Sequence, residues 1–242
     1  EELIDWIQAN PLSLDANYQR VQTAAVFTNA LGIVITGIDA TNHADYIIAE
    51  TFFANTDWPI NNCDFWRAHT NQTAACGAFG DTRWRWMLYD LDVAGEEGAD
   101  FDMLDYLSSS KMTGGSEPGF LINKLWSNWT FRNYFVTRYA NLLNTTFRPE
   151  RMAAIITDAA DAIAPEVERH FQRWGRTFTQ AQWRTAVTDV LIDYTATRHA
   201  VSWQHLDNHF GLGGTGTLTV NNLDPAGTGG RFIVNGITIT TD

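Results

Sequence analysis

The chain has 242 residues, and 45% of them are hydrophobic, which allows one large folded domain, alone or with a small appendage. Its formal net charge is −12, with 16 lysines and arginines against 28 acidic residues. This charge repels a phosphate backbone and an anionic membrane surface, so nucleic acid is excluded as a partner. No apolar run reaches the roughly 20 residues of a membrane-spanning helix, so membrane insertion is not expected. The sequence leaves the oligomeric state unknown.

Helical spacing begins near the N-terminus. Residues 3–9 form one predicted helix, which ends before Asn10-Pro11. Ser13 or Asp15 is expected to cap a second helix that reaches toward Ala25. The first residues are acidic and lack the pattern of a signal peptide, so any export signal is expected to lie outside this chain.

A third helix is predicted after residues 39–42, which offer several N-caps. His43 is expected near its start as a surface or capping residue. Proline disfavours helical angles in the residue before it, so the Trp58-Pro59 pair should end this helix upstream. Asp57 is therefore predicted to lie in a loop.

Two strands follow, over residues 62–69 and 83–91, with a connection rich in Gly, Asn and Thr. They predict a β-hairpin. The first strand begins at Asn62 and the second runs into Asp90 and Asp92, and these ends lie side by side in an antiparallel pair. Asp57, Asn62, Asp90 and Asp92 are therefore expected to share one small volume.

The hairpin also carries arginines. On the second strand Trp84, Trp86 and Leu88 alternate with Arg83, Arg85 and Met87, so one of these two faces should be core. Arg67 and Arg85 are candidate partners of a phosphate or a carboxylate. The alternative is that they are solvated on an exposed face, which is favoured for such arginines.

Residues 93–116 are predicted to form an irregular, mobile loop because glycines, serines and acids dominate them. A calcium site is an alternative for the acids of this loop, but their spacing is not that of a calcium-binding loop, and a solvated loop is favoured. These acids are Glu96, Glu97, Asp100, Asp102 and Asp105.

From Pro118 the pattern is helical. Arg148-Pro149-Glu150 and Pro165 each predict the start of a helix, the second ending at Gly175, and Thr179 is expected to cap a long helix that reaches Phe210. His205 and His209 have the i, i+4 spacing of a zinc pair, although a helix-surface pair is favoured.

The tail changes character after residue 211. Residues 216–221 and 230–235 repeat a short strand pattern with a Gly-rich connection. Two domains are therefore predicted, a helical lobe over 1–211 and a small β appendage, or the start of a second β domain, over 212–242. The fold class is α+β, mainly helical with an inserted hairpin.

The predicted cluster has the chemistry of a hard-cation site, because Mg²⁺ prefers oxygen ligands and often takes one or two carboxylates plus substrate phosphates. Asp57 and Asn62 have the spacing of the catalytic-loop Asp and metal-binding Asn of protein kinases. On the alternative interpretation Asp57 caps a turn, Asn62 satisfies backbone groups, and Asp90 or Asp92 marks a strand end.

Over a longer stretch, the sequence resembles that of the CotH kinase family. The resemblance is carried by Asp39-Ala-Thr-Asn-His-Ala-Asp-Tyr46, Asn55-Thr-Asp-Trp-Pro-Ile-Asn-Asn62 with Phe65-Trp-Arg67, and Trp84-Arg-Trp-Met-Leu-Tyr-Asp-Leu-Asp92, and by later landmarks at Arg173-Trp174 and Arg198. It covers about residues 14–211. It implies a large lobe similar to that of protein kinases.

The resemblance also implies a function: an atypical, secreted or cell-surface kinase that uses ATP and Mg²⁺ or Mn²⁺ to phosphorylate Ser or Thr of protein partners. Carried over by position, Asp57 resembles the catalytic Asp, Asn62 the metal-binding Asn, and Asp90 or Asp92 the metal-binding Asp. Arg67 is assigned with Asn62 to the nucleotide. Because an exported relative is suspected, a disulfide between Cys63 and Cys76 is favoured over two unlinked thiols.

The chain departs from a complete kinase in one respect. Kinases cover the phosphates with a Gly-rich loop and pair them with a strand lysine. No residue before Asp39 supplies either, and the only lysines are Lys111 and Lys124. The N-terminal lobe is therefore expected to be absent from this chain, and its transfer activity to be weak or missing. The competing hypothesis is a non-catalytic extracellular adhesion module with a structural or calcium-binding acidic cluster.

Overall fold

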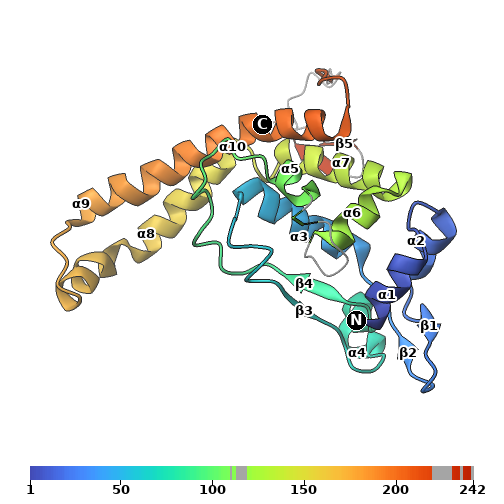
Figure 1. Cartoon of the computed structure of the whole chain (residues 1–242). Helices are drawn as coiled ribbons and strands as arrows, with labels where there is room; N and C mark the ends of the chain where they lie inside the picture. The colour runs from blue at the N-terminus through green and yellow to red at the C-terminus, as the bar shows by residue number, and fades with distance from the viewer. Residues whose placement is uncertain (110, 113–118, 220–230, 235–236, 241–242) are drawn as a thin grey trace.

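The structure is a computed structural model that describes residues 1–109, 111–112, 119–219, 231–234 and 237–240. Its fold is α+β and mainly helical, as predicted, with small two-stranded sheets (Figure 1). The helical segments are α1 Glu2–Ala9, α2 Asp15–Val21, α3 Ala40–Phe53, α4 Thr73–Cys76, η1 Gly77–Gly80, α5 Met103–Ser108, α6 Phe120–Trp126, α7 Trp129–Leu143, α8 Pro149–Arg173, α9 Gln180–Trp183, η2 Arg184–Asp189 and α10 Val190–Phe210. The strands pair as β1 Phe27–Thr28 with β2 Val34–Ile35, β3 Asp64–Trp66 with β4 Arg85–Met87, and β5 Arg231–Val234 with β6 Ile237–Thr240.

Helix α3 is the central element. It contacts α5, α7, α10 and β4, and its side chains join one buried cluster with those of α7 and α10. Phe52 of α3 stacks on Phe147 with ring centroids 4.0 Å apart. Removing such large aromatic side chains from water supplies most of the driving force that holds the helices together.

The two ends of α3 determine where the loop that carries Asp57 lies. Asp39 caps the N-terminus by accepting a hydrogen bond from the backbone N–H of Asn42 at 3.2 Å, which confirms the predicted cap. At the other end Ala54 adopts left-handed angles, with φ 46°, and the chain turns out of the helix. This turn delivers Asp57 to a loop, as predicted.

Helix α8 runs antiparallel to α9 and α10, and the three helices form a long arm (Figure 1). The predicted helix start at Pro165 is wrong, because Pro165 lies inside the continuous helix α8. Proline removes one backbone hydrogen bond there, but the buried side chains of Ala164 and Val167 continue the packed face on both sides of it. Thr179 caps α9, as predicted, and a π-helical turn joins α9 to α10.

Two smaller expectations also differ. The predicted irregular loop after Asp92 contains helix α5, which Asp102 caps by accepting from the backbone N–H groups of Leu104 and Asp105, both at 3.1 Å. Burial of Met103, Leu104 and Leu107 holds this helix on the core. The N-cap of α2 is Leu14, not Ser13 or Asp15.

The predicted hairpin exists, but its strands are shorter than expected. Phe65 lies opposite Trp86, and Asp64 opposite Met87, in an antiparallel register. The expectation of a solvated arginine on β4 is wrong, because Arg85 is 1% exposed. Its guanidinium binds the carboxylates of Asp39 and Asp81, each at 2.9 Å. Burial of the charge is tolerated because both partners neutralise it and carbonyl oxygens take the remaining N–H groups.

In the tail, α10 ends at Phe210 and Gly211 follows in left-handed angles, with φ 63°. Residues 216–219 are not a strand, while residues 220–221 of the predicted first strand lie outside the described residues. The second predicted strand is present as β5, and β6 pairs with it. The domain boundary near residue 211 stays a prediction. Among the described residues, no helix is both long and apolar enough to span a membrane.

Candidate active site

Asp57 lies in the loop after α3, and neighbouring amides hold its carboxylate. Its Oδ1 accepts from Asn61 Nδ2 at 2.7 Å, and its Oδ2 accepts from Asn62 Nδ2 at 2.8 Å. Asn62 adopts φ 53°, a left-handed conformation that Asn tolerates better than most residues. A carboxylate has about four lone-pair positions, so these two bonds fix its orientation and leave it able to accept a further proton or hydrogen bond.

Asp90 and Asp92 lie beyond the end of β4, and both are exposed. Asp90 also has left-handed angles, with φ 55°. The pKa of Asp90 is raised, first by the negative charge of Asp92, then by desolvation, by a hydrogen bond with Asp92 and by the charge of Asp57. The charges of Asp92 and Asp57 therefore both act on Asp90, and Asn62 is joined to this group by its hydrogen bond to Asp57.

Arg67 does not join this group through any contact that the structure shows. Its guanidinium carbon lies 5.0 Å from the ring centroid of Trp84, a cation–π contact on the hairpin. In the described part of the chain it forms no ion pair. Its assignment to the nucleotide stays a prediction.

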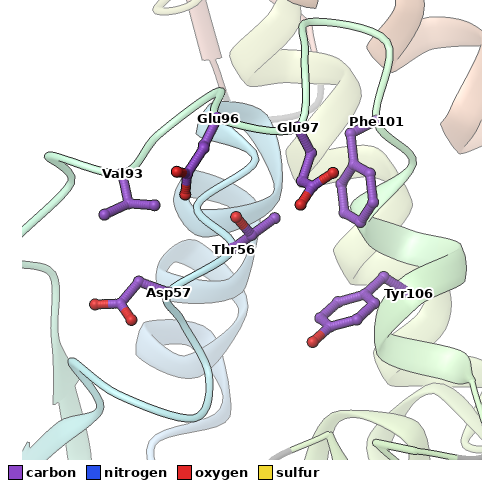
Figure 2. A pocket seen from close by; sticks show the side chains of 7 residues that line it. All are labelled: Thr56, Asp57, Val93, Glu96, Glu97, Phe101 and Tyr106. Carbon is purple, nitrogen blue, oxygen red and sulfur yellow. The ribbon is translucent and has the colours of Figure 1, made fainter.

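A pocket of about 490 Å³ opens beside Asp57 (Figure 2). One wall comes from the loop after α3 and another from the segment that leads into α5. Figure 2 shows the Glu96 and Glu97 side chains extending from that segment toward Thr56. The lining residues are Thr56, Asp57, Val93, Glu96, Glu97, Phe101 and Tyr106. Asp57 thus lines this pocket, whereas Asp90 and Asp92 do not.

The donor set fits a divalent cation, although it is not a complete cage. Across the described ranges no three His, Cys, Asp or Glu side chains are arranged to hold a metal ion on their own. Mg²⁺ usually takes only one or two carboxylates and completes its shell with substrate phosphates and water. The negative charges of Asp92 and Asp57 act on Asp90, and a bound cation would relieve this repulsion. Asn62 uses its amide N–H on Asp57, which leaves its side-chain oxygen as a further ligand.

Sequence reasoning missed a buried polar pair beneath the site. Glu50 and Asn55 are both 0% exposed, and Asn55 Nδ2 donates to Glu50 Oε2 at 3.1 Å and to the Asp90 carbonyl at 3.4 Å. Burial raises the pKa of Glu50 to about 7, and the bond from Asn55 offsets part of that rise. Asn55 therefore connects the core of α3 to the backbone of Asp90. Glu50 recurs on the buried face of α3 with Tyr46, at i, i+4 spacing, and this was the available signal.

Two further expectations near the site are wrong. His43 is 4% exposed, not at the surface, and packs on Trp86 with ring centroids 4.1 Å apart. Burial lowers the pKa of His43 to about 3, so its ring is neutral. Cys63 and Cys76 are free thiols, not a disulfide. Cys63 packs against the core, whereas Cys76 is exposed at the end of α4, within the hairpin connection.

Asp102 of the 93–116 segment and the histidine pair of α10 make structural contacts. Asp102 serves as the cap of α5 and lies 3.9 Å from His205 Nδ1. His209 packs on Trp126, with ring centroids 5.1 Å apart. Within the part of the chain that the structure describes, neither a calcium site in this segment nor a zinc site at the histidine pair is supported.

In this helical lobe, Asp57 and Asn62 have the spacing of the catalytic-loop Asp and Asn of protein kinases, and Asn62 donates a hydrogen bond to Asp57. In a comparison with protein families, the model of the CotH kinase protein family matches residues 19–202, which is most of the chain. The chain belongs to this family, and the resemblance found in the sequence is confirmed. Kinases use ATP as the phosphate donor. Searches of curated proteins and of solved structures gave no match.

Proposed function

We propose that this protein transfers the γ-phosphoryl group of ATP to Ser or Thr hydroxyls of protein partners. The observation that supports the proposal is that Asp57, which Asn62 orients and whose charge acts on Asp90, lines a pocket in a chain of a kinase family. The extracellular or cell-surface setting belongs to the same proposal and rests on the resemblance alone.

Asp57 is the proposed catalytic residue. The acceptor hydroxyl oxygen bonds to the γ-phosphorus as the bond from that phosphorus to the β–γ bridging oxygen breaks, ADP leaves, and the hydroxyl proton passes to the Asp57 carboxylate. The amides of Asn61 and Asn62 fix the direction of this carboxylate. A carboxylate that is already oriented lowers the barrier to phosphoryl transfer because it does not have to be ordered during the reaction.

Asn62, Asp90 and Asp92 are the proposed ligands of Mg²⁺ or Mn²⁺, and Arg67 is a proposed contact of the nucleotide. The bound cation would neutralise the negative charge of the ATP phosphates. Asp57 lines the pocket but neither Asp90 nor Asp92 does, so we assign the two aspartates to the donor and the pocket to the acceptor.

Calorimetry of nucleotide binding tests the donor side. Wild type is expected to bind ATP in the presence of Mg²⁺ or Mn²⁺, and Asp90→Ala or Asp92→Ala to weaken binding by about 10-fold or more, since each removes a charged ligand at the metal–phosphate group. Asp158→Asn removes one exposed carboxylate from α8 and serves as the charge-matched control with unchanged affinity.

If wild type and both alanine variants bind ATP equally well, the assignment of Asp90 and Asp92 as metal ligands is wrong. Melting that depends on calcium but not on nucleotide would instead favour the adhesion module. Transfer by this chain alone is expected to be weak, because neither lysine is placed at the site: Lys124 lies 5.3 Å from the Phe120 ring centroid, and Lys111 is exposed outside the pocket lining.

A further inference from the structure

Arg198 of α10 is a buried cation whose partners are all backbone carbonyls. It is 1% exposed. Its Nε donates to the Phe52 carbonyl at 2.8 Å and its Nη2 to the Thr51 carbonyl at 2.7 Å. Carbonyls at the C-terminal end of a helix lack partners within the helix and carry partial negative charge, so a guanidinium is well matched to the end of α3.

The same guanidinium reaches a second segment. Its Nη1 donates to the carbonyls of Ala99 and Phe101, both at 2.8 Å. These residues belong to the segment that forms the acidic wall of the pocket. No carboxylate forms an ion pair with Arg198 within the described ranges, so its fixed geometry serves to join two stretches of backbone.

Tyr194 lies one turn earlier on α10 and contacts the same two segments. Its hydroxyl donates to the Phe53 carbonyl at 2.5 Å. A Cβ on Gly95 would overlap the Tyr194 ring, so the backbone at Gly95 packs directly on that ring. Gly95 N–H also donates to the Ala54 carbonyl at 3.3 Å. The end of α3 and the start of the pocket wall are therefore tied to each other and to α10.

We propose that Tyr194 and Arg198, the α10 clamp, are positioning residues that set the spacing between the Asp57 loop and the Glu96–Glu97 wall of the pocket. They do not line the pocket and act through the backbone that carries its lining. The inference rests on the proposed function, because it assigns the clamped pocket to the acceptor. It separates acceptor positioning, which depends on α10, from nucleotide binding, which depends on Asp90 and Asp92.

Tyr194→Phe and Arg198→Lys test the clamp with conservative changes. Phe keeps the ring against Gly95 and loses one hydrogen bond, whereas Lys keeps the charge and cannot reach four carbonyls at once. Amide hydrogen exchange of residues 94–101 is expected to rise about 10-fold in each variant, since losing a net hydrogen bond makes local opening easier by that order. The affinity for Mg²⁺–ATP, measured by calorimetry, should stay unchanged, while phosphorylation of dephosphorylated casein should slow by a similar factor.

Arg132→Lys is the matched control. Arg132 Nη2 donates at 2.8 Å to the Phe210 carbonyl, at the other end of α10, and this variant should leave residues 94–101 protected. Unchanged exchange at residues 94–101 in both clamp variants would overturn the proposal, as would a uniform rise over α7 and α10. If wild type neither binds ATP nor phosphorylates casein, the proposed function fails, and the exchange measurement still decides whether the clamp exists. If Arg198→Lys does not fold, Tyr194→Phe gives the decision alone.

Discussion

Asp57→Asn is expected to lower the rate of phosphoryl transfer by about 10³-fold, the middle of the range for removing a group that accepts a proton in the transition state. The Asn side chain keeps the size of Asp and one oxygen, so it can still accept one of the two hydrogen bonds that Asn61 and Asn62 donate to Asp57. What it loses is the negative charge that takes the hydroxyl proton. Affinity for Mg²⁺–ATP should fall little or even rise, because the charge lost lies beside the donor site and is not one of its proposed ligands.

The measurement uses radiolabelled ATP at high protein concentration, because transfer by this chain alone is expected to be weak. Calorimetry of Mg²⁺–ATP binding on the same preparation separates catalysis from binding. Asp158→Asn, with the same change of charge on an exposed face of α8, should transfer at the wild-type rate. A transfer rate for Asp57→Asn within about two-fold of wild type would show that Asp57 is not the proton acceptor.

Glu50→Gln is expected to change how stability depends on pH. The pKa of Glu50 is about 7 in the folded protein against 4.5 for an ordinary Glu, because burial disfavours the charged carboxylate. Below pH 4.5 both states hold the proton and the group has no effect. Between pH 4.5 and about 7 the unfolded chain releases its proton first, so the folded state loses stability as pH rises, by about 3 kcal/mol in all.

Glutamine cannot ionise and can still accept the hydrogen bond from Asn55. The free energy of unfolding of Glu50→Gln minus that of wild type should therefore increase by about 3 kcal/mol between pH 4.5 and pH 8. Urea unfolding at both pH values measures it, and the subtraction cancels other titrating groups such as His43. Glu168→Gln, an exposed change on α8, should give a flat difference. A flat difference for Glu50→Gln as well would show that Glu50 is not held as a buried, protonated acid.

Local sequence signals predicted the loop that holds Asp57 and the hairpin that follows it. Proline at position 59 placed Asp57 in a loop, and the two aromatic runs predicted the hairpin whose second strand leads to Asp90. Both signals act over a few residues, where backbone sterics and strand alternation decide the structure. The mainly helical α+β class followed from the same kind of periodicity.

Contacts between distant segments could not be predicted in this way. The burial of Arg85 depends on Asp39, which lies 46 positions away and is joined to β4 by a hydrogen bond from its N–H to the Trp84 carbonyl at 2.9 Å. Pro165 was interpreted as a helix start because its local effect is unfavourable in a helix, yet packing along α8 outweighs that effect. The Asn55 bridge to Asp90 likewise required knowledge of the tertiary fold.

The most direct test of the central claim is the position of a bound metal ion. Crystals grown with Mn²⁺ and a non-hydrolysable ATP analogue should give an anomalous diffraction peak within ligand distance of Asn62 and of Asp90 or Asp92, with the nucleotide phosphates beside it and the Asp57 carboxylate facing the γ-phosphate. A manganese ion bound away from these side chains, with the analogue elsewhere or absent, would contradict the assignment of this site to phosphoryl transfer.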